Sequence, residues 1–195
     1  IPVAEMIKYV SNAFLATKIS FANEIGNICK KHGIDTEEVF RGVGMDHRIN
    51  PAFFRSGIGF GGSCFPKDVR ALIARAQELG VDPKILRNVA EVNEEQPLKL
   101  ITLLEKHVPE LKGKKIGVLG LAFKPDTDDI RDSRAIPIVE KLLQKGATVL
   151  AYDPMAMGNF KKIFPTINYA SSARDVLAAD AVLIATEWRD FENLD

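Results

Sequence analysis

The sequence has little cysteine, no surplus of either charge and no long apolar run. Two cysteines among 195 residues cannot form a disulfide framework, so we expect a reducing, cytoplasmic setting. Lys and Arg total 26, as do Asp and Glu, so no basic surplus indicates a nucleic-acid or anionic-membrane partner. No apolar run approaches the roughly 18 residues that cross a bilayer, and no signal peptide is visible. Since the chain starts at Ile1 without Met and stops at Asp195 soon after an expected strand, we expect part of a longer protein.

A dinucleotide-binding fingerprint is also absent. The segment GVLGLAF (117–123) contains Gly117 and Gly120 but no G-x-G-x-x-G pattern, and no helix is expected to begin directly after it. Asp153 ends a later expected strand, as the ribose-binding acid of such folds does, but without the glycines this signal is weak. We therefore predict no NAD pyrophosphate site at this position.

The first part of the chain is predicted to be all-helical. Residues 3–31 form one long expected helix whose apolar positions recur close to the helical period: Ile7, Val10, Phe14, Ile19, Phe21 and Ile25. Its apolar residues occupy more than one face, which predicts burial between subunits or domains and hence a homodimer. Further helices are expected at 35–43, 66–80 and 82–108, the last with a kink or break at Pro97. A loop of about twenty residues, 44–63, is long enough to indicate function.

The second part alternates apolar strands with helices. Strands are expected at 115–123, 148–153 and 181–186, with helices at 134–145 and 172–179. Near-continuous apolar strands separated by helices predict a parallel sheet. The predicted fold is therefore α + α/β, with a helical dimerisation domain at 1–108 and a Rossmann-like domain at 109–195 that is incomplete at its end.

The stretch GIGFGGSCFPKD (57–68) is the first candidate site. Cys64 follows four glycines and precedes a helix that Pro66 is expected to begin, where free amides and the helix dipole favour a thiolate. Lys67 adds a positive charge. The alternatives are a reactive thiol or a small buried residue for Cys64, and a proton-accepting carboxylate or a simple first-turn acid for Asp68. We expect no metal ligands.

Two other groups of polar residues can be interpreted either as parts of a functional site or as polar surface. Glu5, Lys8 and Asn12 form one stripe on the long helix, which is either part of a site or a solvated face. Lys124 and Arg131 lie after the first expected strand, where sheets of this kind bind ligands, and they either hold phosphates or belong to a charged surface loop.

Four motifs together resemble the UDP-glucose/GDP-mannose dehydrogenase family. They are AEMIKYVSNAFLATKISFANEI (4–25), DHRIN (46–50), GFGGSCFPKD (59–68) and GLAFKPDTDDIRDS (120–133), and they occur in the family's order. The resemblance implies oxidation of a sugar-nucleotide C6 alcohol to a carboxylate with two NAD⁺. It also implies a central dimerisation region and a C-terminal UDP-binding domain. The family's N-terminal NAD domain has no counterpart here, so the isolated chain is expected to be inactive.

The resemblance assigns roles to individual residues. Cys64 corresponds to the nucleophile, Lys8 and Asn12 to the groups around the C6 oxygen, and Asp68 to an acid that helps water. Arg48 corresponds to an arginine that reaches a neighbouring subunit's substrate. The substrate loop corresponds to Arg55, Ser56, Gly57, Ile58, Gly59, Phe60 and Gly61, and a further substrate pair to Phe123 and Lys124. Contacts to NAD are assigned to Lys67 and Arg131.

Three readings of the function remain from the sequence. The neighbourhood GGSCFPKD is more similar to the branch that oxidises UDP-glucose than to the branch for UDP-N-acetyl sugars, with GDP-mannose as the alternative substrate. A second reading is an inactive sugar-nucleotide-binding and dimerisation module. The third is a scaffold of the 2-hydroxyacid or 6-phosphogluconate dehydrogenase type without cysteine chemistry.

Overall fold

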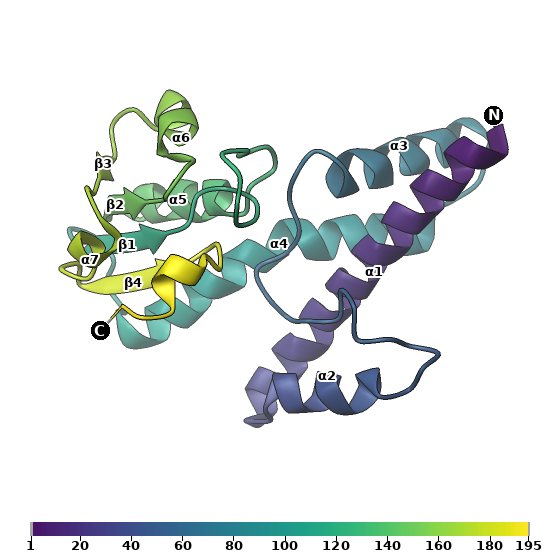
Figure 1. The fold of residues 1–195 in the computed structure, drawn as a ribbon, viewed down its shortest axis with the longest axis horizontal. Helices are drawn as coiled ribbons and strands as arrows, with labels where there is room; N and C mark the ends of the chain where they lie inside the picture. Colours follow the sequence, from purple (N-terminus) through teal and green to yellow (C-terminus); the bar gives the residue numbers. More distant parts are fainter. Residues whose placement is uncertain (1, 195) are drawn as a thin grey trace. The chain divides into compact units, whose positions relative to one another are not determined.

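The computed structural model describes residues 2–194 and divides the chain into two compact units, one ending at Gln96 and the other beginning at Pro97 (Figure 1). The first unit contains three helices and the start of a fourth: α1 (Pro2–His32), α2 (Thr36–Gly44), α3 (Phe65–Glu78) and α4 (Lys84–His107). Helices α3 and α2 pack against the N-terminal and C-terminal halves of α1, respectively (Figure 1).

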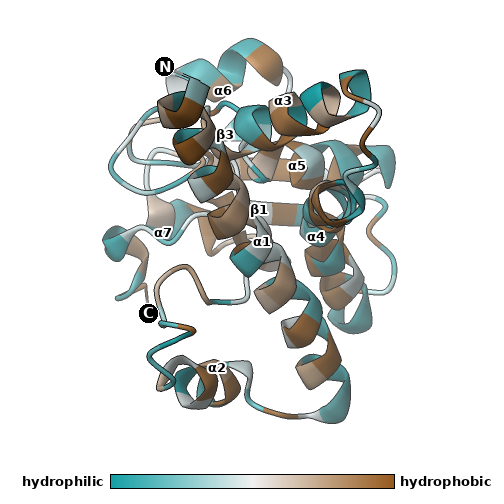
Figure 2. Ribbon diagram, turned by 90° about the vertical axis from the view of Figure 1, so that its right-hand side faces the viewer, coloured by the Kyte–Doolittle hydropathy of each residue, from teal (hydrophilic) through white to brown (hydrophobic). Residues whose placement is uncertain are grey.

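Helix α1 packs through small residues and not through its large apolar ones. Its buried positions are Ala13, Ala16, Ser20, Ala22, Asn23, Gly26 and Cys29. Gly26 is required there, because a Cβ at this position would clash with the side chain of Ser56. The larger residues Ile7, Val10, Phe14 and Phe21 are exposed in the single chain, and Figure 2 shows hydrophobic positions along α1. The predicted helix is therefore correct, and the packing within the chain uses its small residues, whereas burial of its large apolar residues between subunits stays a prediction.

Helix α2 begins at Thr36, one residue later than predicted, because Asp35 caps it. The Asp35 side chain accepts hydrogen bonds from the backbone N–H groups of Glu37 and Glu38, which have no partner within the helix. Residues 45–64 then form the long loop, and it is ordered by contacts with α1. The ammonium group of Lys18 donates to the backbone carbonyls of Ile49, Asn50 and Ala52 at 3.0, 2.8 and 2.7 Å.

Helix α4 is one continuous helix with Pro97 inside it, so of the predicted kink or break, the break does not occur. Proline has no N–H to donate to the carbonyl of Asn93 and its ring crowds that turn. Packing of α4 compensates, since Val89, Ile101 and Leu104 are all buried.

The second unit contains a four-stranded parallel sheet in the order β3-β2-β1-β4. Its strands are β1 (Lys115–Leu119), β2 (Thr148–Tyr152), β3 (Asn168–Tyr169) and β4 (Ala181–Ile184). Its helices are α5 (Ala135–Gln144), α6 (Met157–Ile163) and α7 (Ala173–Val176), followed by the short 3₁₀ turn η1 (Arg189–Phe191). Helices α5 and α7 pack against β1 and β2. The predicted class, α + α/β, is confirmed.

Strand β1 is shorter than predicted because Gly120 turns the chain. Gly120 has φ of +87°, and a Cβ there would collide with the backbone of Thr186. Helix α6 and the two-residue strand β3 were not predicted. Both elements are too short to give a periodic apolar signal, although Phe160 of α6 is buried.

No helix within residues 2–194 combines the length and the apolar character that a membrane span needs.

Candidate active site

Cys64 lies at the N-terminus of α3, as the N-cap residue, and its side chain is exposed. The helix starts at Phe65, one residue earlier than predicted, with Pro66 in its first turn. The backbone N–H of Asp68 donates to the Cys64 carbonyl at 2.9 Å, which closes that turn. The thiol is therefore not the small buried residue of the alternative reading; Cys29 is buried instead.

Asp68 is fully buried, and three side chains converge on its carboxylate. Asn12 Nδ2 donates to Oδ2 at 2.6 Å, the Lys8 ammonium lies 3.1 Å from the same oxygen, and Lys67 Nζ lies 2.5 Å from Oδ1. Lys8 and Asn12 are one helical turn apart on α1, so they face α3 together. The structure thus brings Lys8, Asn12, Lys67 and Asp68 into one cluster, beginning one helical turn beyond Cys64.

The cluster keeps Asp68 ionised. Burial of the carboxyl raises its pKa, but hydrogen bonds from Lys67, Asn12 and Lys8 outweigh burial, and the net pKa of Asp68 is lowered. The hydrogen bond to Asp68 raises the pKa of Lys67, against a smaller effect of burial and with smaller contributions from the charges of Asp68, Tyr9 and Cys64. Two ammonium groups and one carboxylate leave one net positive charge beside the thiol.

The ring of Tyr9 completes this cluster. The Lys8 and Lys67 ammonium groups lie 5.3 and 5.8 Å from the ring centroid. Both distances are within the range of cation–π attraction. Tyr9 therefore helps to hold two like charges side by side.

The predicted substrate loop, residues 55–61, lies in the same unit and is bound by buried side-chain amides. The backbone N–H of Gly57 donates to Asn23 Oδ1 at 2.7 Å, and that of Phe60 donates to Asn93 Oδ1 at 2.7 Å. Phe60 is buried in the core with Ala13, Ala16, Val69 and Val89. Gly59 adopts φ of +102°, a conformation that favours glycine.

Arg48 and Arg55 are both exposed and paired with acids. Arg48 makes a bidentate pair with Asp46, from Nε to Oδ1 at 3.0 Å and from Nη2 to Oδ2 at 2.5 Å, and this hydrogen bonding lowers the pKa of Asp46. Arg55 lies 3.8 Å from Glu37. Neither arginine joins the cluster around Asp68.

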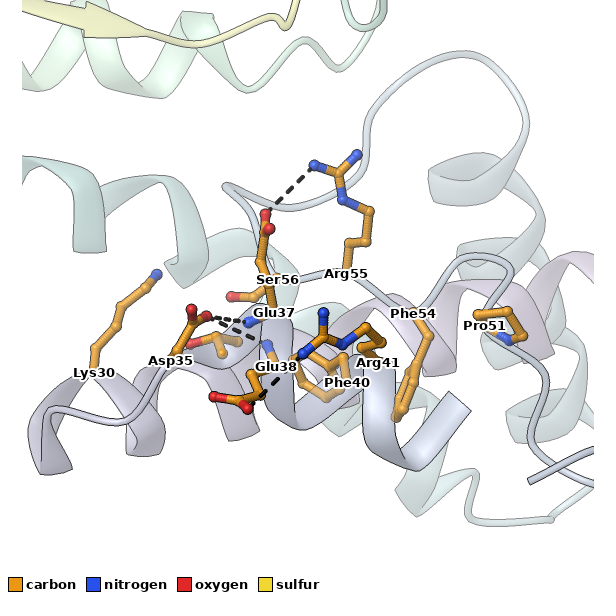
Figure 3. Close-up of a pocket in the computed structure, with 11 residues that line it drawn as sticks. Lys30, Asp35, Glu37, Glu38, Phe40, Arg41, Pro51, Phe54, Arg55 and Ser56 are labelled. Carbon is orange, nitrogen blue, oxygen red and sulfur yellow. Dashed lines mark hydrogen bonds and ion pairs between the residues drawn. The ribbon is translucent and has the colours of Figure 1, made fainter. Parts of the chain in front are cut away.

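A hollow beside α2 is lined by Arg55 and by Ser56, whose buried hydroxyl has no hydrogen-bond partner (Figure 3). Its acids already have partners, since Asp35 caps α2 and Glu38 lies 3.8 Å from Arg41. Figure 3 shows these pairs around Phe40 and Phe54. We assign no site to this hollow.

In the second unit, the predicted pair Phe123–Lys124 follows β1 at the carboxyl end of the sheet. Lys124 Nζ lies 5.6 Å from the Phe123 ring centroid. The preceding residues are held on both sides: Leu121 and Ala122 donate to Asp153 Oδ2 at 2.7 and 3.1 Å, while their carbonyls accept from Ser133 and Thr186. Parallel sheets bind ligands at this end of their strands.

The segment after β1 does not fit a dinucleotide pyrophosphate. Its Leu121 and Ala122 N–H groups, which would have to contact the phosphates, are bound to Asp153. Arg131, assigned to NAD, makes a bidentate pair with Asp129 that lowers the pKa of that acid. Within residues 2–194 no three His, Cys, Asp or Glu side chains are arranged to hold a metal ion.

Several residues of the site were not predicted from the sequence, chiefly Tyr9, Lys18, Asn23, Asn93 and Gln96. A signal existed for Asn23. With Asn23 included, the residues of one face of α1 follow one another at spacings of three or four: Ala13, Ala16, Ser20, Asn23 and Gly26. Asn23 therefore lies on the same face as these small residues. No comparable signal marks Asn93 or Gln96, because α4 carries many polar residues and only packing shows which are buried.

Two family models match the chain. The central domain of the UDP-glucose/GDP-mannose dehydrogenase family matches residues 2–95, and the UDP binding domain of that family matches residues 117–195. The chain belongs to this family. The prediction drawn from the four motifs is confirmed.

Relatives in the family are similar over nearly the whole chain. UDP-glucose 6-dehydrogenase AglM from Haloferax volcanii is 53% identical over 193 residues, which are 98% of this chain and 45% of the relative. UDP-glucose 6-dehydrogenase from Rickettsia bellii is 49% identical, with the same coverage of 98% and 45%. The structure of a UDP-glucose dehydrogenase from Pyrobaculum islandicum aligns with a TM-score of 0.96 at 46% identity, over 98% of this chain and 45% of that one. The chain thus spans less than half the length of these relatives.

Proposed function

We propose that this chain supplies the nucleophile and the UDP-binding part of an NAD-dependent UDP-glucose 6-dehydrogenase. Family membership and the names of the relatives support the substrate. The observation that carries the proposal is the convergence of Lys8, Asn12 and Lys67 on buried Asp68, one helical turn from exposed Cys64. Cationic and amide donors beside an accessible thiol are the groups that thiolate chemistry on a carbonyl needs.

In the proposed reaction the Cys64 thiolate attacks the C6 aldehyde formed by the first oxidation. The new C–S bond gives a thiohemiacetal whose oxygen is negatively charged. Lys8 and Asn12 stabilise that oxyanion, since both donate from fixed positions on α1. Loss of a hydride from C6 leaves a thioester, and water releases the carboxylate and restores the thiol.

Asp68 has a positioning role in this scheme and a role with water. Its lowered pKa means that it stays a carboxylate and accepts hydrogen bonds from Lys8 and Asn12 across the neutral pH range. These bonds hold the two donor side chains in fixed positions. In the hydrolysis step a carboxylate can also orient the attacking water.

NAD is the proposed hydride acceptor for both oxidation steps. Lys67 and Arg131 are the proposed contacts of this chain to it. Both already pair with acids, Asp68 and Asp129, so they can add charge near a cofactor but do not form a pyrophosphate cradle.

Each unit has proposed substrate contacts of its own. The loop Arg55 to Gly61, including Ser56, Ile58 and Phe60, is the proposed contact in the first unit, and Phe123 with Lys124 in the second. Arg48 is proposed to reach the substrate of a second copy, consistent with its exposed position. We further propose a cytoplasmic homodimer formed through α1.

Cys64→Ser tests the nucleophile. In the complete protein, the wild type should reduce two NAD⁺ per UDP-glucose, whereas the variant should release no acid. The chain alone offers a direct readout: a ¹³C6-labelled aldehyde of UDP-glucose should show the thiohemiacetal carbon by NMR, and C64S should not.

Cys29→Ser is the matched control, because Cys29 is buried in α1. Acid release from C64S at the wild-type rate would refute the assignment.

Calorimetry with UDP-glucose, GDP-mannose and NAD⁺ separates the substrate alternatives. A chain that binds UDP-glucose but never forms the adduct would be the inactive binding module.

A further inference from the structure

Three buried carboxamide side chains bind the backbone of the glycine-rich loop at two points. At the first point, Asn93 of α4 pairs with both backbone groups of Phe60. Its Oδ1 accepts from the Phe60 N–H at 2.7 Å and its Nδ2 donates to the Phe60 carbonyl at 3.0 Å. One carboxamide thus occupies the place that a neighbouring strand would take.

The second point is Gly57, which is bound from two helices. Asn23 of α1 accepts from the Gly57 N–H at 2.7 Å, and Gln96 of α4 donates to the Gly57 carbonyl at 2.7 Å. Asn27 Nδ2 donates to Gln96 Oε1 at 2.8 Å, which fixes the orientation of the Gln96 amide. Both backbone groups of Gly57 are therefore paired, as those of Phe60 are.

These carboxamides are among the least exposed polar side chains in the first unit. Asn23, Asn93 and Gln96 are 0%, 2% and 2% exposed. Burying an amide is unfavourable unless its hydrogen bonds are made, and a buried Leu or Met would fill the same space at lower cost. Asn23 Oδ1, both polar atoms of the Asn93 amide and Gln96 Nε2 have loop backbone atoms as partners, whereas Asn23 Nδ2 has no hydrogen-bond partner. These four bonds to the loop are what the burial of the amides secures.

We propose that Asn23, Asn93 and Gln96 form a clamp that positions the loop 57–60 for substrate, with all three acting as positioning residues. The clamp holds the two ends of the turn and leaves Ile58 and Gly59 between them to face the ligand. This inference rests on the proposed function for its substrate, a nucleotide sugar. The clamp itself rests only on the four backbone hydrogen bonds to Gly57 and Phe60.

Asn93→Ala in the 195-residue chain tests the clamp, with Asn88→Ala as the matched control. Asn88 lies on the same helix and is exposed. Amide hydrogen exchange is followed by NMR at Gly57 and Phe60 and at the middle of α1. We expect exchange at Phe60 to rise at least about tenfold in N93A, with α1 unchanged, because two hydrogen bonds to the loop are lost. N88A should match the wild type.

Calorimetry with UDP-glucose gives the functional half of the test. We expect N93A to bind about tenfold more weakly, since the loop must then be ordered on binding. Faster exchange with unchanged affinity would overturn the positioning role, and unchanged exchange would overturn the clamp. If wild-type chain binds no UDP-glucose, the proposed function and its positioning role fail, while the exchange data still decide whether the clamp exists.

Two near-isosteric variants keep the test usable if N93A does not fold. Asn93→Asp retains an acceptor for the Phe60 N–H and should protect that amide more than N93A does. Gln96→Glu replaces the donor to the Gly57 carbonyl with an acceptor, so it should release Gly57 while Phe60 stays protected. A Gly57 amide that stays as protected in Q96E as in the wild type would contradict the second point of the clamp.

Discussion

At the scale of single residues, a few buried polar side chains determine the shape of the proposed site. Asp68 illustrates this, because its carboxylate has no exposed surface and is surrounded by hydrogen-bond donors. Its sequence position predicted either a first-turn acid or a proton acceptor. Asp68 does lie in the first turn of α3, and the structure adds that it is buried and that Lys8 and Asn12 bind it.

The charge of Asp68 should give a pH-dependent stability. Because its folded pKa lies below the unfolded value of about 3.9, its contribution is present above pH ~4 and is lost as pH falls through the folded pKa. We expect wild type to be more stable than Asp68→Asn at pH 7, with the difference shrinking below pH ~4. Urea unfolding from pH 7 to pH 3 measures this.

Asp190→Asn, an exposed position, is the control and should track the wild type at every pH. A D68N variant that parallels the wild type throughout would show that the carboxylate charge adds nothing to folding.

At the scale of secondary-structure elements, both proposed binding segments are loops held by side chains from other elements. After β1, the carboxylate of Asp153 accepts from Leu121 and Ala122 through Oδ2, and from Met155 and Ala156 through Oδ1 at 2.8 and 2.7 Å. Trp188 Nε1 donates to Oδ2 at 3.1 Å. Asp153 therefore organises the ends of two strands and does not act as the ribose acid considered from the sequence.

Asp153→Asn should destabilise the chain by about 3 kcal/mol although it preserves size and shape. Whichever way the amide is turned, its NH₂ group faces at least two N–H donors. Asp180→Asn is the matched control, since one Asp180 oxygen accepts a single backbone N–H from Lys115 at 2.7 Å and an amide can turn its oxygen there. Equal unfolding free energies for D153N and D180N in urea would contradict this account.

The elements themselves were largely predictable, whereas the contacts that hold the loops were not. Helix α1 and strand β2 follow from apolar period and from Gly33 and Asp153 at their ends. The role of Asp68 depends on residues 56 and more positions away, such as Asn12. Pairing over such separations leaves no local pattern, so the sequence showed Lys8 and Asn12 only as a stripe, and the resemblance alone related it to Cys64.

At the scale of the whole molecule, the exposed apolar residues of α1 support self-association. Val3, Met6, Ile7, Val10 and Phe14 are each at least half exposed in the single chain. A soluble monomer rarely keeps such residues together on one element, and covering them removes apolar area from water.

The double variant Val10→Glu, Phe14→Glu should shift sedimentation at micromolar concentration from dimer toward monomer. Glutamate keeps the helix propensity of α1 high, so the effect reports on the surface and not on the helix. Ile85→Glu, an exposed helical position on α4 that is 69% exposed, should leave the association unchanged. A wild-type chain that sediments as a monomer at these concentrations would contradict the dimer.

The ammonium of Lys18, bound to three backbone carbonyls, has a consequence for ionic strength. Ions in solution weaken attraction between exposed charges such as Arg48 and Asp46, with a screening length of about 3 Å at 1 M salt. A half-buried cation that contacts carbonyl dipoles at 2.7 to 3.0 Å has no counter-charge for dissolved ions to replace. The loop that presents Arg48 should therefore keep its backbone shape in concentrated salt, while the attraction between Arg48 and Asp46 weakens.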